Sequence, residues 1–292
     1  MRKSHWWSMG LILALACQQA GARELHILLA NDDGYQAPGL LAVREALQAA
    51  GHRVTVVAPR ADQSGSSVKI TTAQIGIKEE SPGVWVVDGS PADAVLVALR
   101  RILKDAAPDL VVSGANRGQN PGAVTNVSGT VGAAVMAAMH GVPALAVSVG
   151  IDFTEAAQGF PSTVAAYSGA AQFVTRVVAQ LAEQAEGEPL LPPRTLLNIN
   201  YPALAPGVIK GARWSELDSG FGYAISYRDG DAPDTVKLTF GPDETTYAAE
   251  ATTDTARFAA GYITVTLLDT SWLAPRGARA NAVRRLGSLI EP

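Results

Sequence analysis

Between residues 24 and 150, short apolar runs alternate with segments whose apolar residues recur at helical spacing. The runs, each of a length suited to a buried strand, are residues 25–30, 53–58, 84–87, 109–113 and 144–149. The helix-like segments between them are residues 38–51, 91–107 and 130–140. This alternation predicts an α/β fold, a Rossmann-like and mostly parallel sheet with helices on both faces.

The second half of the chain has a different rhythm. A long helix is expected at 164–185 and a strand at 195–201, whereas short runs broken by Gly and Asp at 207–240 predict hairpins. A short helix at 253–260 and a final strand at 262–268 follow. We therefore expect a signal peptide at 1–22, a catalytic domain at 23–206 and a β-rich extension at 207–292 that completes the same fold.

The first residues have the pattern of an export signal. Arg2 and Lys3 precede an apolar run at 9–17, and Ala-Gly-Ala at 20–22 suits signal peptidase. The interpretation is an exported, periplasmic protein whose mature chain begins at Arg23. The alternatives are an N-terminal membrane anchor or a misassigned start codon. No later segment is apolar enough to cross a membrane, so no span is expected after cleavage.

Composition and charge limit the kinds of molecule that the protein is expected to bind. Hydrophobic residues make up 48% of the 292 residues and charged residues 17%, as in globular proteins. A net charge of −4 gives no reason to expect binding to long nucleic acids. Cys17, the only cysteine, would leave with the signal or carry a lipid in a lipoprotein. Cleavage would leave no disulfide and no thiol nucleophile.

Four polar clusters stand out, and three of them directly follow predicted strands, where ligands of open α/β sheets gather. The first, Asn-Asp-Asp-Gly at 31–34, places the carboxylates of Asp32 and Asp33 side by side. Such crowding is costly without a cation, and Mg²⁺ and Mn²⁺ favour oxygen ligands. The alternative is a turn with solvated side chains.

Two further clusters supply oxygen and nitrogen donors. The loop at 62–67 offers hydroxyls, including that of Ser64, and a glycine. The segment at 113–120 offers the amides of Asn116 and Asn120 and the guanidinium of Arg117, which suits phosphate. Each could instead be an ordinary polar loop.

The fourth cluster opens a helix of small residues. Ser128, Gly129 and Thr130 stand where unpaired N–H groups and the helix dipole would attract a phosphate. The alternative is simple N-capping by Ser128 or Thr130. The sequence contains no P-loop, no Gly-x-Ser-x-Gly elbow and no Arg-His-Gly phosphatase signature.

Seven motifs, taken in order, resemble those of the SurE survival-protein nucleotidases across about residues 25–148. They are 31–34 with Ala-Pro-Gly at 37–39, Val-Val-Ala-Pro at 56–59 with Gln-Ser-Gly at 63–65, Ser-Pro-Ala-Asp at 90–93, 112–118, and 128–134. Weaker echoes follow at 197–202 and 261–266. The chain departs from the usual family pattern at Val127 and Met136, which puts substrate preference in question and leaves the metal ligands intact.

The resemblance implies a divalent-metal-dependent phosphomonoesterase acting on nucleoside 5′- and 3′-monophosphates. It implies one Mn²⁺ or Mg²⁺ per subunit and a homodimer or homotetramer whose C-terminal elements act as an oligomerisation arm. By position, the catalytic residues would be Asp32, Asp33 and Asn116. The implied metal ligands are Asp32, Asp33, Ser64 and Asn116, and the phosphate-binding residues would be Arg117, Asn120, Ser128, Gly129 and Thr130.

Two other functions remain open at this point. One is a broad-specificity acid phosphatase with no preference for nucleotides. The other is a periplasmic nucleotide- or phosphate-binding protein without turnover. The adjacent carboxylates of Asp32 and Asp33 argue against the second, because simple anion binding has no use for them.

Overall fold

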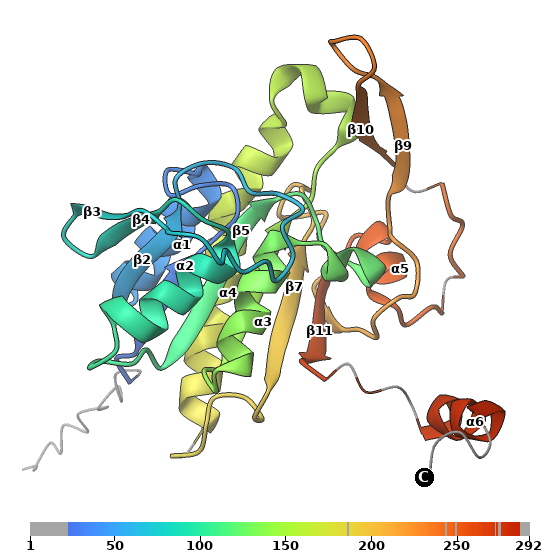
Figure 1. Cartoon of the computed structure of the whole chain (residues 1–292). Helices are drawn as coiled ribbons and strands as arrows, with labels where there is room; N and C mark the ends of the chain where they lie inside the picture. Colours follow the sequence, from blue (N-terminus) through green and yellow to red (C-terminus); the bar gives the residue numbers. More distant parts are fainter. Residues whose placement is uncertain are drawn as a thin grey trace, which may run out of the picture.

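The computed structural model describes residues 23–185, 187–242, 244–248, 250–271, 273 and 276–286. The predicted signal peptide, with Cys17, lies outside the described residues. The strands are β1 (His26–Ala30), β2 (Arg53–Pro59), β3 (Ile77–Ser81), β4 (Val84–Val87), β5 (Leu110–Arg117), β6 (Ala144–Val149), β7 (Thr195–Tyr201), β8 (Ala212–Trp214), β9 (Ala224–Asp229), β10 (Val236–Gly241) and β11 (Ile263–Asp269) (Figure 1). The α-helices are α1 (Pro38–Ala49), α2 (Pro91–Val97), α3 (Gly129–Met139), α4 (Pro161–Gln184), α5 (Asp254–Ala259) and α6 (Arg276–Leu286). A π-helical turn η1 (Ala98–Ile102) and the 3₁₀ turns η2 (Gly122–Asn126) and η3 (Phe153–Gln158) complete the set.

A single large sheet organises the described residues. Its strand order is β3-β4-β2-β1-β5-β6-β7-β11-β8. The six strands from β4 to β7 pair in parallel, whereas β3 and β11 run antiparallel to their inner neighbours. The predicted Rossmann-like, mostly parallel sheet is therefore confirmed. Strands β8 and β11 belong to this sheet although they come from the C-terminal extension.

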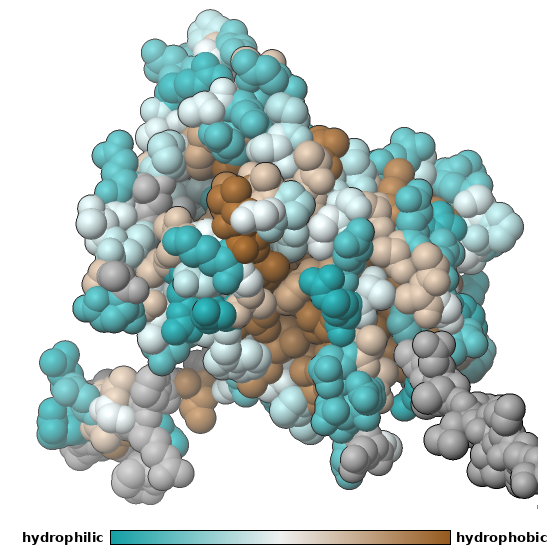
Figure 2. Space-filling view, turned by 180° about the vertical axis from the view of Figure 1, so that it is seen from behind, coloured by the Kyte–Doolittle hydropathy of each residue, from teal (hydrophilic) through white to brown (hydrophobic). Residues whose placement is uncertain are grey.

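Helices cover both faces, as Figure 1 shows. Alternate residues of β1 explain this arrangement. Ile27 and Leu29 pack with α1 and α4, while Leu28 and Ala30 pack with α2 and α3. Both faces of the central strands are thus buried, which is why these strands read as continuous apolar runs. From behind, apolar side chains gather in the middle of the surface with polar ones around them (Figure 2).

Two predicted segments differ in extent from the structure. The helix expected at 91–107 ends its α-helical part at Val97 and continues as η1 only to Ile102. Strand β5 extends to Arg117, because it resumes pairing with β6 at Asn116 after an irregularity. The third polar cluster is therefore partly inside a strand instead of following one.

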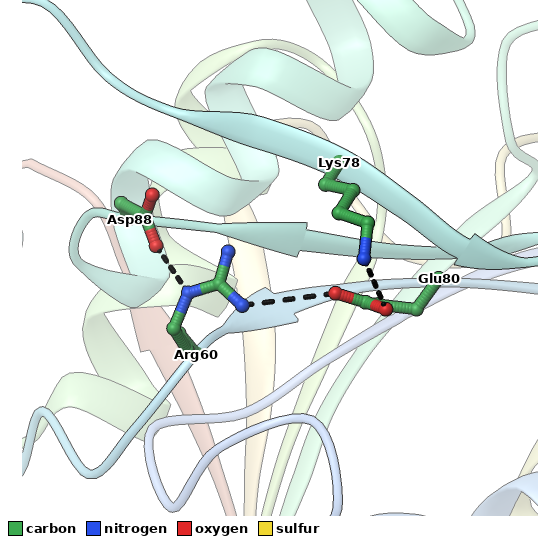
Figure 3. A network of polar contacts seen from close by, with 4 residues as sticks. All are labelled: Arg60, Lys78, Glu80 and Asp88. Carbon is green, nitrogen blue, oxygen red and sulfur yellow. Dashed lines mark hydrogen bonds and ion pairs between the residues drawn. The ribbon is translucent and has the colours of Figure 1, made fainter.

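The strand β3 was not predicted. All five of its residues are exposed, so it has no apolar run to reveal it. Figure 3 shows the ion pairs at this edge: Arg60, directly after β2, lies 2.6 Å from Asp88 and 3.7 Å from Glu80 of β3, and Lys78 and Glu80 pair within β3 at 2.8 Å. Such exposed pairs contribute little stability, but charges on an edge strand oppose further strand pairing.

The hairpin formed by β9 and β10 makes a separate two-stranded sheet that projects from the body of the molecule (Figure 1). Its strands pair in register from Ala224 opposite Gly241 to Asp229 opposite Val236. This fulfils the expectation of a hairpin within 207–240. Among the described residues, no helix has the length and apolar character that a membrane span requires.

Candidate functional site

The candidate site lies at the carboxyl end of β1, where a tight turn carries two carboxylates. The side chain of Asn31 closes this turn, because its Nδ2 donates to the carbonyl oxygen of Gly34 at 2.8 Å. The turn sends the neighbouring carboxylates to different partners. Asp32 reaches the start of α3, and Asp33 reaches the end of β5.

Asp32 is almost fully buried, with 3% of its surface exposed. Its Oδ1 accepts a 2.5 Å hydrogen bond from the hydroxyl of Thr130. Burial raises the pKa of Asp32 to about 6, against the opposing effect of the Thr130 hydrogen bond. Burial therefore favours the protonated form of Asp32. A bound cation would supply the positive charge that stabilises the carboxylate.

Asp33 is held by the backbone of the neighbouring strand. Its Oδ2 accepts a 2.9 Å hydrogen bond from the N–H of Arg117. Burial raises the pKa of Asp33, while the hydrogen bond and charge of Arg117 oppose that shift. The guanidinium itself is half exposed and lies 3.8 Å from a carboxylate oxygen of Asp62.

The start of α3 packs directly on Asp32. A Cβ on Gly129 would lie 2.8 Å from the Asp32 Oδ2 and 2.8 Å from the Ser66 hydroxyl. Only glycine permits this approach, which places the positive end of the helix beside the carboxylate. The hydroxyl of Ser128 accepts from the N–H of Val131 at 3.1 Å, so Ser128 caps the helix. Any phosphate contact here would use backbone N–H groups.

The two predicted asparagines are fixed in different ways. Asn116 donates through Nδ2 to the carbonyl of Gly118 at 2.7 Å, which leaves its Oδ1 for a ligand. Asn120 donates to the Ser148 hydroxyl at 2.9 Å. Its backbone N–H donates to Asn200 at 2.7 Å, and its carbonyl accepts from Asn198 at 2.8 Å. The Asn120 backbone is therefore clamped from β7.

Sequence reasoning missed this clamp. Asn198 and Asn200 are fully buried in β7, a strand whose other residues are mostly apolar. Asparagines at alternate positions of a buried strand could have indicated it, because buried polar groups require hydrogen-bond partners. The sequence could not identify Asn120 as their partner, because it lies 80 positions before Asn200 in the chain.

A cleft of about 160 Å³ brings most of the predicted residues together. Among the predicted residues, Asp32, Ser64, Asn116, Arg117, Asn120 and Ser128 line it. Asp33, Gly129 and Thr130 do not line the cleft; they contact residues that do. Its other residues are Gly65, Gly118, Gln119, Val124, Val127, Ile151, Tyr223 and Phe240. Val127, which precedes the motif at 128–134, is a position where the chain departs from the family pattern. The other aromatic and aliphatic members were not predicted, because no motif surrounds them.

The donors suit a hard cation. Among the described residues no group of three His, Cys, Asp or Glu side chains gathers as a metal site. A metal at the cleft would rely on Asp32 and Asp33 with neutral oxygens of Ser64 and Asn116. All these atoms are oxygens, the ligand type of Mg²⁺ and Mn²⁺. The residues therefore fit a divalent ion of this class.

Comparison with known proteins identifies relatives. The family described as "Survival protein SurE" matches residues 27–221. A "5'-nucleotidase SurE" of Bradyrhizobium sp. (strain ORS 278) is 33% identical over 248 residues, which are 84% of this chain and 93% of the relative. A protein of the same name from Parvibaculum lavamentivorans is 37% identical over 194 residues, 66% of each chain. The crystal structure of SurE protein from Aquifex aeolicus superposes with a TM-score of 0.72 at 30% identity, covering 89% of this chain and 99% of that one.

Proposed function

This chain belongs to the Survival protein SurE family, and from that premise we propose that the Asp32 cleft is its active site. The chain is a 5′-nucleotidase, a phosphomonoesterase that hydrolyses nucleoside monophosphates to nucleoside and phosphate. One observation carries the placement. A buried carboxylate stands at the N-terminus of α3 in a cleft that Ser64 and Asn116 also line.

We propose that one divalent ion, Mn²⁺ or Mg²⁺, binds per subunit at this cleft. When bound, such an ion polarises a phosphoryl oxygen and lowers the pKa of water. Asp32, Asp33, Ser64 and Asn116 would hold it. The hydroxyl of Thr130 fixes the Asp32 carboxylate, and the backbone of Arg117 fixes that of Asp33.

The phosphate would lie against the start of α3. The first N–H groups of a helix have no intrahelical acceptor, and the helix dipole favours an anion there. Gly129 and Thr130 would supply these N–H groups. Asn120, held by Asn198 and Asn200, and the Arg117 guanidinium would complete the phosphate contacts.

The assay is turnover by purified mature protein after dialysis against EDTA, with and without Mn²⁺ or Mg²⁺. The substrates are 5′-AMP, 3′-AMP, p-nitrophenyl phosphate and polyphosphate. We expect hydrolysis of the nucleoside monophosphates that EDTA abolishes and the metal restores. Full activity in EDTA would refute the metal site. Equal rates on 5′-AMP, 3′-AMP and p-nitrophenyl phosphate would indicate the broad acid phosphatase. Binding of nucleotides without turnover would indicate a nucleotide-binding protein.

We also propose that the chain is exported to the periplasm and begins at Arg23. The support is the charged start, the apolar run and the Ala-Gly-Ala at 20–22. N-terminal sequencing of protein from the native host should start at or near Arg23. An intact Met1 in a cytosolic fraction would contradict this.

We propose in addition a homodimer or homotetramer. Support comes from one face of the β9–β10 hairpin, where apolar side chains of both strands are exposed. These side chains, here called the hairpin apolar face, are Ile225, Tyr227, Val236 and Leu238. Phe240, directly opposite Ile225, lies at the end of the same face and also lines the cleft. Light scattering coupled to size exclusion should give a mass of two or four subunits.

A further inference from the structure

The cleft at Asp32 also has an apolar lining, here called the apolar wall, that the phosphate chemistry does not use. Besides the polar groups, the side chains of Ile151, Tyr223 and Phe240 line the cleft. Phe240 belongs to β10, and Tyr223 comes directly before β9. The hairpin therefore contributes two aromatic rings to the cleft that holds the carboxylate.

The rings form a connected series. Phe153 and Tyr223 meet edge to face, with centroids 5.8 Å apart at 88°. Tyr223 and Phe240 are also 5.8 Å apart, at 63°. Figure 1 shows the hairpin rising beside the segment that leads into α4, where Phe153 lies in η3. Edge-to-face packing of this kind holds each ring in a defined orientation.

Hydrogen bonds tie this wall to the polar side of the cleft. The Tyr223 hydroxyl donates to the carbonyl oxygen of Gln119. The side chain of Gln119 accepts from the N–H of Ile151 at 3.0 Å. Gln119 also stands directly before Asn120, which the β7 asparagines clamp. The apolar wall therefore has a fixed position relative to the proposed phosphate contacts.

The wall offers ring surface and few hydrogen-bonding groups. The Tyr223 hydroxyl is already engaged, and Ile151 and Phe240 have no polar side-chain atoms. Phe240 keeps half of its surface, 50%, exposed. A planar heterocycle gains by stacking on such a ring whatever its hydrogen-bonding edges are. A ribosyl group without a base would gain nothing from it.

We propose that Phe240 and Tyr223 form the nucleobase subsite of this cleft and that it recognises the planar base by stacking, with little discrimination between bases. This rests on the proposed function, because it assumes that the phosphate of the same molecule lies at Asp32. Phe240 is then the residue that favours nucleotides over phosphate esters without a ring. Tyr223 positions Phe240 and closes the subsite against Gln119.

The kinetic test compares Phe240→Ala with the matched control Phe221→Ala. Phe221 is exposed near the hairpin and does not line the cleft. The substrates are 5′-AMP, 5′-UMP and ribose 5-phosphate. We expect Phe240→Ala to lower kcat/KM for both nucleotides at least about fivefold, mainly through KM, and to leave ribose 5-phosphate within about twofold. Phe221→Ala should change none of the three.

A binding test separates this inference from the proposed function. Adenosine, which has no phosphate, is titrated calorimetrically into the wild type and both variants. Binding that weakens at least about fivefold in Phe240→Ala alone supports the subsite, even if the wild type hydrolyses no nucleotide. Equal adenosine affinity in all three proteins overturns the subsite, and so does an equal loss on ribose 5-phosphate. Circular dichroism of each variant confirms that it is folded.

Discussion

The carboxyl end of the central sheet and the β9–β10 hairpin differ in almost every physical respect. Around Asp32, side chains are buried and the backbone of α3 approaches too closely for any residue but glycine. On the hairpin, all six residues of β9 are exposed, and its strands pair only with each other among the described residues. In the proposed assignment, the residues that carry the chemistry follow buried strands, whereas those proposed to contact the nucleobase belong to a peripheral element. A change in the first region should cost activity or folding, and a change in the second should alter preference.

The largest effect is expected at Asp32. Asp32→Asn removes one of the proposed charged oxygen ligands and should lower kcat for 5′-AMP at least about 100-fold, because a Lewis-acid metal supplies several kcal/mol. The matched control is Asp231→Asn, the same change in the exposed turn between β9 and β10. Steady-state kinetics with saturating Mn²⁺ measures both. A comparable loss of kcat in both variants would contradict the proposed difference between the two regions.

The second prediction concerns close packing behind the site. A Cβ on Gly132 would lie 2.0 Å from the carbonyl oxygen of Ser67, so α3 or the loop at 62–67 must move in Gly132→Ala. We expect about 1–3 kcal/mol less stability to urea, together with reduced activity, because that loop carries Ser64. Gly207→Ala is the control, since nothing lies within 4 Å of its Cβ. If Gly132→Ala is as stable as the wild type, the loop at 62–67 can move to accept the extra methyl group without cost, and this prediction is wrong.

The sequence predicted the buried region far better than the exposed one. The apolar runs of β1, β2, β6 and β7 identified their strands, because residues buried on both faces of a parallel sheet must be apolar. Asp32, Ser64 and Asn116 were found through motifs at strand ends, and the structure brings them to one cleft. Their roles as metal ligands remain predictions.

What could not be predicted depends on contacts between distant residues. The exposed strand β3 has no periodic apolar pattern, and Phe240 has no motif around it. The bond from Tyr223 to Gln119 joins residues 104 positions apart, and that from Asn120 to Asn200 spans 80. Composition and spacing carry no information about such pairs, because the topology alone creates them.

The third prediction tests a buried carboxylate that is structural. Asp93 accepts from Thr71 N–H at 2.8 Å, from the Thr71 hydroxyl at 2.7 Å and from Ser90 N–H at 2.9 Å. Burial would raise the pKa of Asp93, but these hydrogen bonds outweigh it and hold the pKa below its usual value. Asp93→Ala should therefore cost about 1–2 kcal/mol of stability while leaving kcat unchanged.

The pH dependence of this stabilisation has a definite sign. Because the folded pKa lies below the unfolded value of about 3.9, the contribution is fully present above that value. It is lost as the pH falls through the lower, folded pKa. The stability difference between wild type and Asp93→Ala should therefore be constant at neutral pH and shrink in acid. Urea titrations at several pH values measure it, with exposed Asp105→Asn as the control. A difference that grows in acid would show that this account of Asp93 is wrong.

The smallest effect on folding is expected on the hairpin apolar face. Tyr227 and Val236 are each 68% exposed, so Tyr227→Ser and Val236→Ser remove little that is buried within one subunit. Each should change the unfolding free energy by no more than about 0.5 kcal/mol, measured in urea at a protein concentration low enough for the wild type to be monomeric. If the hairpin apolar face joins subunits, the double variant should have the mass of one subunit at concentrations where the wild type is oligomeric. Its apparent stability should then fall only at high concentration, because association stabilises the folded state by mass action. A loss above about 2 kcal/mol at low concentration would place these side chains in the folding core of the subunit, and an unchanged mass would place the oligomer contact elsewhere.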